Sequence, residues 1–350
     1  MLKNSSRSVR MLLIAVLAVF VVVSIILAIN IGAVNINPKI IFSIIANRIT
    51  GKEVFPATWS NGQESIVWNL RFPKVLVAGC VGAGLALAGV FMQALTKNPL
   101  ADPYILGISS GASTGAVLSI LVGTLPVIGK LPLHTGAFFG ALFTAGLVFI
   151  FGSKSIRGGT TRLVLVGMAV SALFSALTDL IIFLTPDSKK VTSAMFWMTG
   201  SFAGVSWSDV PPAVIALIIG VIVAIAIRRE MDALLMGEQM ARNYGVNVTL
   251  IKLVMIITST LLTAVMVSMS GIIGFVGLVI PHISRQLMGA NHSRMLPITL
   301  LVGSAFMIWA DVIARVCVAP EELPVGVVTA ICGAPFFLAI LRKSRYDFGK

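Results

Sequence analysis

The sequence has few charged residues: only 11% of its 350 residues are Asp, Glu, Lys or Arg, whereas 57% are hydrophobic. Soluble domains carry about 25% charged residues, so the composition excludes an ordinary soluble protein. Apolar runs recur from end to end, many reaching the roughly 18 residues that a helix needs to cross a bilayer. We therefore predict an all-α, polytopic membrane protein in which residues 1–350 form a single transmembrane domain.

Cysteine, histidine and nucleotide-binding motifs are scarce as well. Three cysteines and three histidines are scattered singly, without a CxxC pair, so we expect no metal site. The chain contains no GxxxxGK[ST] phosphate-binding loop, and no Ser/His/Asp set or carboxylate pair lies in a plausible active-site loop. These absences indicate a protein that moves or transmits something, is not an enzyme and binds no cofactor of its own.

Ten membrane spans are expected from the apolar runs. The eighth is too short for a full crossing at about 1.5 Å per residue and is expected to pack within the bundle. With the N-terminus inside, most of the 26 Lys and Arg residues fall on the inner side, as the positive-inside rule requires. The excess of positive charge thus indicates an N-in, C-in protein in contact with lipid and no nucleic-acid partner. The expected spans are 11–31, 65–95, 104–122, 134–152, 162–185, 211–229, 250–271, 274–288, 295–315 and 324–342.

Two longer segments, 32–63 and 186–210, are expected on the outer side. In the first, Asn37-Pro38 resembles a helix start, and isoleucines from Ile40 to Ile49 form an apolar stripe. This pattern predicts a short helix lying at the membrane surface. The second segment carries Phe196, Trp197 and Trp207, and tryptophan at a membrane interface is usually an anchor.

A polar, helix-compatible island interrupts the apolar sequence at 231–247, MDALLMGEQMARNYGVN. Acidic residues come first, a base follows, and Gly237 and Gly245 divide the segment. Leu234, Leu235, Met240 and Tyr244 have the spacing that places apolar side chains on one helical face, so we expect all four to share it. The island is too polar for lipid and too patterned for a slack linker, which favours a docking site for another protein.

A second constellation, NPLADPYILGISSGASTG, spans 98–115. Its prolines break the helix at the inner mouth, and Asp102-Pro103 fits an N-cap followed by a first helical residue. Gly107, Gly111 and Gly115 recur every four residues and would form one small-residue stripe. This stripe is consistent either with tight packing or with a moving interface beside a pathway.

Several charges and one histidine fall inside or near predicted spans. Asp311 and Arg315 lie four residues apart and are expected to pair. Arg71 and Lys74 lie at the outer start of the second span and, with Arg315, form either an outward basic patch or ordinary snorkelling side chains. Asp179 has no obvious partner, which points to a functional acid or to a local Ser/Thr hydrogen bond. His282 follows Pro281 and is either a structural residue or a proton relay.

Six segments in order resemble the FecCD/BtuC-like family of permease subunits in type II ABC importers. This resemblance runs from about residue 10 to the C-terminus. It implies ten helices per subunit, a second permease subunit that is identical or paralogous, two cytoplasmic ATPase subunits that hold ATP and Mg, and an extracytoplasmic substrate-binding protein. The matching segments are RFPK (71–74), MQALTKNPLADPYILGISSGA (92–112), FWMTGSFAGVSW (196–207), GFVGLVIPHISR (274–285), ADVIAR (310–315) and ELPVGVVTAICGAPFF (322–337).

The resemblance also implies roles for individual residues. Lys74 stands where the family often has Arg, which keeps the charge but loses the bidentate fork. Within a coupling loop at 230–249, the ATPase contacts implied are Leu234, Leu235, Met236, Gly237, Glu238, Ala241, Arg242 and Gly245. The binding-protein contacts implied are Arg71, Lys74 and Arg315. The gate and pathway residues implied are Thr96, Asn98, Pro99, Asp102, Gly107, Gly111, Asp179, Trp197 and Thr199.

On this resemblance, the expected function is import of a metal chelate, foremost an iron(III)–siderophore, across the cytoplasmic membrane of a bacterium. Haem or cobalamin import are alternatives within the family. A proton-coupled secondary transporter that titrates Asp179, Asp311 or His282 is an alternative of a different class, and a membrane receptor or scaffold is a third.

Overall fold

A computed structural model describes residues 7–121, 124–125, 129–130, 132–152 and 161–343. Within these ranges nearly all regular structure is helical, as predicted. The ends of the predicted domain, residues 1–6 and 344–350, lie outside the described residues. The longer helices are α1 (Arg7–Asn30), α4 (Phe72–Thr96), α6 (Leu133–Gly152), α8 (Thr161–Phe183), α10 (Val210–Ala226), α13 (Val248–Ser270), α15 (His292–Val316) and α16 (Val325–Lys343). The shorter elements are α2 (Pro38–Thr50), α3 (Asn61–Glu64), η1 (Ser65–Arg71), η2 (Pro103–Leu106), α5 (Ile108–Leu121), β1 (Thr124–Leu125), β2 (Gly129–Lys130), α9 (Ser188–Met198), η3 (Trp207–Asp209), α11 (Arg228–Leu235), α12 (Glu238–Asn243) and α14 (Val276–Met288).

Seven helices of the described chain are long and apolar enough to cross a membrane. They are α1, the continuous helix from α3 through α4, α6, α8, the helix of η3 and α10, α13 and α15. The remaining predicted spans are occupied by α5, α14 and α16, and the apolar part of α16, Val325–Ala339, is too short to be counted with these seven. The 13 residues of α14 agree with the expectation that the eighth span is short. The number of full crossings stays a prediction.

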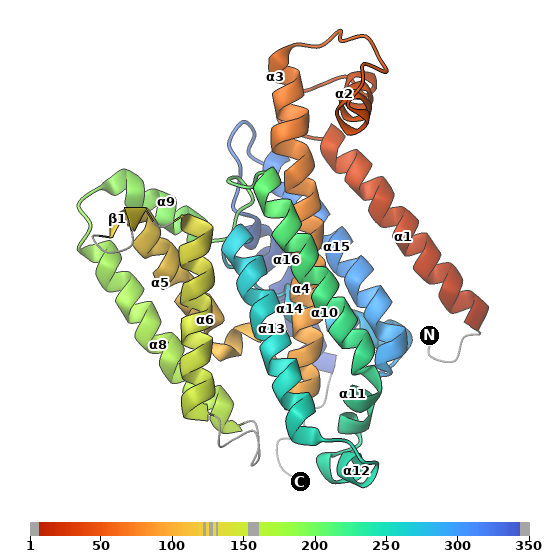
Figure 1. The fold of residues 1–350 in the computed structure, drawn as a ribbon, viewed down its shortest axis with the longest axis vertical. Helices are drawn as coiled ribbons and strands as arrows, with labels where there is room; N and C mark the ends of the chain where they lie inside the picture. The colour runs from red at the N-terminus through yellow and green to blue at the C-terminus, as the bar shows by residue number, and fades with distance from the viewer. Residues whose placement is uncertain (1–6, 122–123, 126–128, 131, 153–160, 344–350) are drawn as a thin grey trace.

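Helix α4 is the centre of the larger lobe, and almost every residue from Pro73 to Leu95 is buried. It packs against α10, α13, α14 and α15 (Figure 1). Glycines permit the closest approaches: a Cβ on Gly82 would overlap the carbonyl of Gly303 in α15, and one on Gly89 would overlap that of Gly277 in α14. Backbones therefore touch directly at these crossings, as in small-residue packing within membranes.

A second lobe consists of α5, α6, α8 and α9 and lies to the left in Figure 1. Gly111 and Gly115 of α5 face Gly140 and Gly136 of α6 so closely that a Cβ on either α5 glycine would overlap backbone. Gly107 is not part of this stripe, contrary to the prediction. It ends η2 in the left-handed conformation, with φ at 74°, because the chain must turn before α5 begins.

The outer segment 32–63 forms α2, which begins as predicted: the Asn37 side chain caps it by accepting a hydrogen bond from the Lys39 amide at 3.0 Å. Its isoleucines do not form one face toward lipid, however. Ile41 and Ile44 are buried against the protein's own residues, including Val67, whereas Ile49 is exposed. The helix packs on η1 and the end of α1, and its position at the membrane surface stays a prediction.

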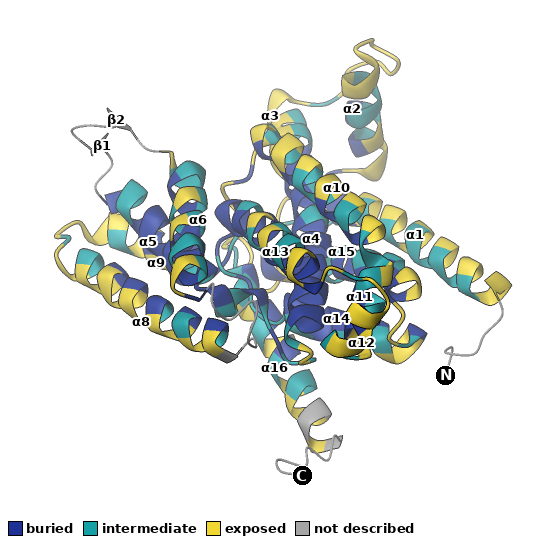
Figure 2. Cartoon of the chain, turned by 60° about the horizontal axis from the view of Figure 1, so that its bottom comes forward, coloured by how far each residue is buried: buried dark blue, intermediate teal, exposed yellow. Residues whose placement is uncertain are grey.

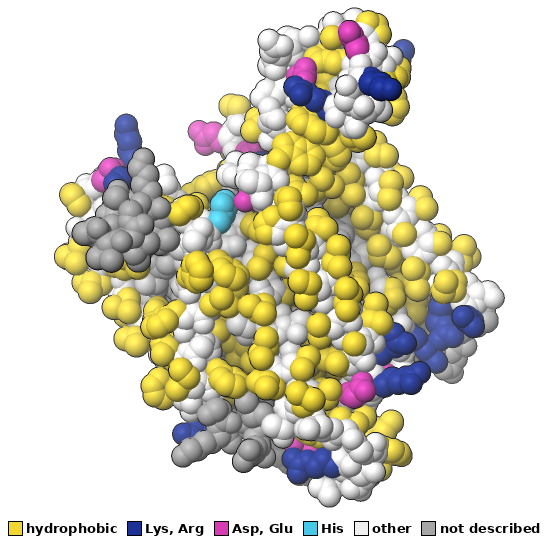
Figure 3. Space-filling model, in the orientation of Figure 1, with side chains coloured by type: hydrophobic (Ala, Val, Ile, Leu, Met, Phe, Trp, Pro, Cys, Tyr) yellow, Lys and Arg dark blue, Asp and Glu magenta, His cyan; other side chains and the backbone are white. Residues whose placement is uncertain are grey.

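The buried residues concentrate in the centre of the bundle, whereas α1, α8 and α10 present many exposed side chains (Figure 2). Figure 3 shows a broad hydrophobic band, with most charged side chains above and below it. Such a band matches the hydrocarbon layer of a bilayer. The start of α1 and the α11–α12 pair lie at one end of the band, while α2, α3 and α9 lie at the other (Figure 1).

Candidate functional site

The polar island forms two short helices, α11 and α12, which lie beyond the end of the hydrophobic band. Gly237 joins them with φ at 116°, and Gly245 leaves α12 with φ at 80°. Residues other than glycine rarely adopt these backbone angles, so glycine is favoured at both tight turns. The location of a structured polar motif at 230–249 agrees with the sequence prediction.

The two helices expose an apolar surface, hereafter the coupling face: Leu235, Met236, Met240 and Tyr244. Met236 is 68% exposed and Tyr244 is 70% exposed. The prediction that Leu234 shares this face is wrong, because Leu234 points inward and is buried in the main core together with Ala241. These two residues support the motif from behind, and neither has a surface to offer a partner.

The first helix of the motif is held to α15 by Asp232. Its carboxylate accepts hydrogen bonds from the Asn291 side chain at 3.0 Å and the His292 amide at 2.9 Å, and its Oδ1 lies 2.6 Å from Nδ1 of His292. His292 is buried at the first position of α15. Asp232 therefore joins α11 to the beginning of a helix that packs along α4.

The second helix is held to α13 by Glu238. One carboxylate oxygen accepts a hydrogen bond from Nζ of Lys252 at 2.7 Å, and Lys252 is only 2% exposed. Arg242 lies 3.8 Å from the other oxygen. Burial raises the pKa of the Glu238 carboxyl, but the Lys252 hydrogen bond and the charges of Lys252, Lys97 and Arg242 lower that pKa below its ordinary value. The carboxylate is consequently ionised when it holds α12 to the bundle.

These two attachments were not recognised in the sequence. The sequence predicts neither the contact of Asp232 with Asn291 and His292 nor that of Glu238 with Lys252. Asp232 and His292 are 60 residues apart, and no local pattern connects them. The only available signal was the occurrence of acids in a polar segment beside buried helices.

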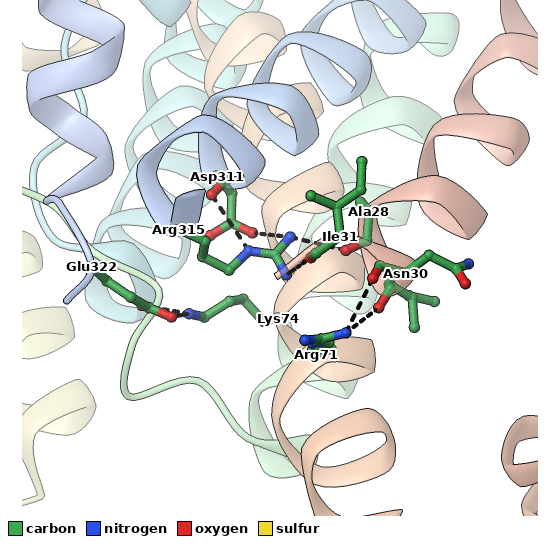
Figure 4. Close-up of polar contacts among 9 residues, drawn as sticks. Ala28, Asn30, Ile31, Arg71, Lys74, Asp311, Arg315 and Glu322 are labelled. Atoms are coloured by element: carbon green, nitrogen blue, oxygen red, sulfur yellow. Dashed lines mark hydrogen bonds and ion pairs between the residues drawn. The ribbon is translucent and has the colours of Figure 1, made fainter. Parts of the chain in front are cut away.

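At the opposite end of the bundle, Arg71 and Arg315 lie against the C-terminal end of α1 (Figure 4). Arg315 forms the predicted ion pair with Asp311 at 3.0 Å. Both guanidinium groups donate hydrogen bonds to backbone carbonyls in the last turn of α1, which a helix end leaves without intrahelical partners, and in the segment that follows α1. The acceptors are Ile29, Asn30 and Val34 for Arg71, and Ala28 and Ile31 for Arg315.

Lys74 lies beside the two arginines and binds Glu322, with Nζ 2.7 and 2.8 Å from the two carboxylate oxygens. Arg71, Lys74 and Arg315 are each less than 10% exposed, so they form neither an exposed patch nor snorkelling side chains in this structure, and their contact with a binding protein stays a prediction. Inside the protein, backbone carbonyls and carboxylates accept hydrogen bonds from these three cationic groups. The three side chains and Glu322 nevertheless line a cavity of about 170 Å³.

The predicted gate segment, residues 96–107, forms a sequence of tight turns between α4 and α5. Asn98 accepts a hydrogen bond from the Leu100 amide at 2.9 Å, and Asp102 accepts one from Tyr104 at 2.8 Å, which confirms the predicted N-cap. Thr96 donates to the carbonyl of Met92, and Pro99 lies between these turns. The Tyr104 hydroxyl donates to the carbonyl of Ile273, so the segment is tied to the loop before α14.

Two further predicted pathway residues lie near the end of α9, toward the end of the bundle opposite α11 and α12 (Figure 1). Trp197 is buried in the core at the end of α9, and its indole N–H has no hydrogen-bond partner among the described residues. Thr199 is exposed and donates to the carbonyl of Phe196 at 2.7 Å. The next residue, Gly200, lies close to the backbone at Gly271. The structure therefore brings Trp197 and Thr199 to the junction of α9 with the end of α13. In sequence they are about 100 residues from the predicted gate residues 96–102.

Asp179 lies on the exposed side of α8. Within the described chain its carboxylate forms no hydrogen bond or ion pair, and the neighbouring Thr178 instead bonds to Thr114 at 2.8 Å. The same face of α8 carries exposed Met168 and Phe183, and exposed leucines lie on the adjoining face. A charge on an apolar surface at membrane depth is costly without a partner, so this surface is a candidate for subunit contact.

Comparison with known proteins places the chain in a family. The model of the FecCD transport family matches residues 19–343. The chain is 40% identical over 277 residues to the cobalamin import system permease protein BtuC of Halobacterium salinarum, covering 79% of this chain and 73% of that protein. It is 38% identical over 290 residues to the Fe(3+)-citrate import system permease protein YfmD of Bacillus subtilis, covering 82% and 84%.

A solved structure described as an inward-facing conformation of a metal-chelate type ABC transporter is also similar. Its TM-score is 0.79 with 33% sequence identity, and the match covers 95% of this chain and 99% of that one. The helical bundle, the structured α11–α12 motif and these matches lead to one conclusion. The chain belongs to the FecCD transport family and is a multi-pass permease of an ABC importer.

Proposed function

We propose that the chain forms half of the membrane pathway of an importer that carries an iron(III)–siderophore across the cytoplasmic membrane of a bacterium. Separate ATPase subunits hold ATP and Mg²⁺, and an external binding protein delivers the chelate. The N-terminus, the C-terminus and the α11–α12 motif lie on the cytoplasmic side. The observation that carries this proposal is the coupling face, an exposed apolar surface on a motif fastened to two core helices.

The ATPase engages the coupling face through Leu235, Met236, Met240 and Tyr244. Movement of the motif passes through Asp232 to α15 and through Glu238 to α13. Both helices pack on α4, so a displacement at the motif becomes a displacement of the bundle. Because packed interiors resist compression, the helices move as rigid bodies and open the gate near residues 96–107.

A second permease copy packs against α8. The exposed leucines of this helix supply apolar contact, and the partner copy supplies polar atoms for Asp179. The pathway then lies between the copies. Replacement of Asp179 by Asn is expected to weaken dimer formation without creating or abolishing a dependence of uptake on the proton gradient.

The binding protein engages the outer cavity that contains Arg71, Lys74 and Arg315. Glu322 occupies Lys74 in the free permease, with a side chain 36% exposed. A carboxylate on the binding protein replaces Glu322 at Lys74, so docking is an exchange of one ion pair for another. This explains how a nearly buried lysine contributes to capture.

The cargo is assigned as iron chelate because a relative 38% identical carries the name of a ferric citrate permease. The cobalamin permease at 40% identity keeps cobalamin as an alternative, and haem is a third. Binding of the three cargo classes to the cognate binding protein, measured by isothermal calorimetry, decides between them. Tight binding of cobalamin or haem with no binding of ferric siderophores would refute the iron assignment.

Reconstitution in vesicles tests the importer mechanism. We expect uptake of cargo only when the permease, the ATPase, the binding protein and ATP are all present. ATP-independent uptake by the permease alone would refute the proposal. Uptake driven by a proton gradient and lost in Asp179→Asn would instead identify a secondary transporter.

A further inference from the structure

Two cavities meet at Ser293, at the end of the bundle that carries α11 and α12. The first lies between α10 and α15 over α4 and has a volume of about 400 Å³. Its walls are apolar, with Leu87, Val221, Ala224 and Leu300 among them, and Arg228 lies at its end. From Val221 to Arg228 the slot follows α10 for about 10 Å at the helical rise per residue.

The second cavity lies between the start of α1 and the turn that leads into α15, with a volume of about 490 Å³. Three arginines line it: Arg7 and Arg10 from α1 and Arg294 from α15. Ser293 lines both cavities. An apolar slot therefore continues into a basic hollow.

The charge of this site is of one sign. Among the described residues that line the two cavities, four are arginines and none is Asp or Glu. Arg7, Arg10 and Arg228 form no ion pair with any acidic side chain in the described ranges. Figure 3 shows Lys and Arg side chains gathered at the lower right, with an acidic side chain beside them.

We propose that an anionic glycerophospholipid binds here, with one acyl chain in the α10–α15 slot and its phosphate held by Arg228 and the arginines across Ser293. The slot lies at the depth of the hydrophobic band, because Ile222 and Ile225 beside it are exposed. Its end lies where hydrocarbon gives way to headgroups. Arginine binds phosphate with two parallel N–H donors, and basic pockets between membrane helices on the cytoplasmic side hold anionic headgroups.

The arrangement selects an anionic lipid over a zwitterionic one. The guanidinium groups of Arg7, Arg10 and Arg228 attract the phosphate but repel the ammonium of phosphatidylcholine, and no carboxylate among the described lining residues compensates that ammonium. Phosphatidylglycerol presents the phosphate without the opposing charge. The bound lipid connects the start of α1, the start of α15 and the beginning of α11, whether or not the proposed cargo is correct.

Native mass spectrometry of the full-length permease in mild detergent tests the proposal. Phosphatidylglycerol and phosphatidylcholine with the same acyl chains are added in parallel. We expect one phosphatidylglycerol to be retained in preference to phosphatidylcholine. Each basic residue near a membrane surface contributes about a fivefold change in anionic lipid binding, so R10Q/R228Q should weaken retention about 25-fold.

Matched variants separate the site from general surface charge and from simple anion binding. Arg229 is exposed on the same helix and does not line either cavity, so R229Q should have much less effect than R228Q. V221W fills the slot and should abolish lipid retention while all four arginines stay in place, and I215W on the exposed side of α10 should not. If V221W does not fold, the comparison of R228Q with R229Q still distinguishes a specific lipid site from general surface charge.

Three results would overturn the proposal. The first is equal retention of the two lipids by the wild-type protein. The second is an equal loss in R228Q and R229Q, which would reduce the effect to surface charge. The third is displacement of phosphatidylglycerol by millimolar inorganic phosphate, which would identify a free-anion site.

Discussion

Replacement of Asp232 by Ala should detach α11 from α15. The carboxylate makes three polar contacts, to the Asn291 side chain, the His292 amide and the His292 ring, at 2.6 to 3.0 Å. A hydrogen bond to a charged group contributes about 1.5–3 kcal/mol. Because water partly replaces the lost contacts at a side chain that is 23% exposed, the three together are worth about 3 kcal/mol.

A loss of about 3 kcal/mol raises the population of the detached state roughly 150-fold. Hydrogen–deuterium exchange of the purified permease measures this population directly. We expect amides of residues 228–235 and the first turn of α15 to exchange faster by up to this factor in Asp232→Ala. Asp232→Asn, which keeps an acceptor but loses the charge, should have an intermediate effect.

The same variant should lower the amount of cargo transported per ATP hydrolysed in vesicles that contain the whole complex. Asn243→Ala is a suitable control, because Asn243 is exposed at the end of α12 and its side chain makes no hydrogen bond in the described structure. Unchanged exchange at α11 in Asp232→Ala would refute the idea that this carboxylate fastens the motif. Faster exchange with unchanged transport would refute only its role in coupling.

Four other outcomes are expected. Glu238→Lys should abolish coupling while the protein still inserts, because it sets a second positive charge against buried Lys252; normal transport would contradict this. The ion pair should also respond to pH: the folded-state pKa of Glu238 lies below the ordinary 4.5, so its stabilisation is present above that pH and is lost as the pH falls through the lowered value, measurable as faster exchange in α12. Glu322→Gln should free Lys74 and tighten capture of the binding protein, more clearly at low salt, in surface plasmon resonance; weaker capture would show that Glu322 itself is a contact. Asp311→Ala should lower the unfolding free energy in detergent by about 3–5 kcal/mol, because it leaves a buried guanidinium without its carboxylate, and replacing the arginine by leucine as well should restore part of that loss.

The positions of the long helices could be read from the sequence because lipid imposes them. A span in hydrocarbon must satisfy its own backbone hydrogen bonds, so an apolar run such as 250–271 becomes a helix, here Val248–Ser270. The turns at Asp102 were also predictable, since a short acid before proline caps the element that follows. Gly107 was assigned wrongly because spacing alone does not distinguish a helical glycine from a left-handed one at a helix end.

The site could be located but its construction could not be predicted. The polar island was visible because it contrasts with its surroundings, yet the inward direction of Leu234 depends on how α11 rests on the bundle. For Arg71 the sequence predicts an outward patch or a snorkelling side chain, because it gives no sign that the end of α1, about 40 residues earlier, brings its carbonyls to the guanidinium. Contacts between segments that are distant in sequence determine both the inward direction of Leu234 and the hydrogen-bond partners of Arg71.

The glycine crossings of α4 with α14 and α15, and of α5 with α6, restrict where the protein is able to bend. Where backbones are in direct contact, no side chains lie between the helices to slide or repack. The two helices at each crossing therefore move together as a rigid unit. The two lobes then tilt as blocks, and the bending falls on the segments that join them, residues 97–107 between α4 and α5 and residues 199–206 between α9 and η3. Substitutions that stiffen these segments would arrest the transporter in one orientation.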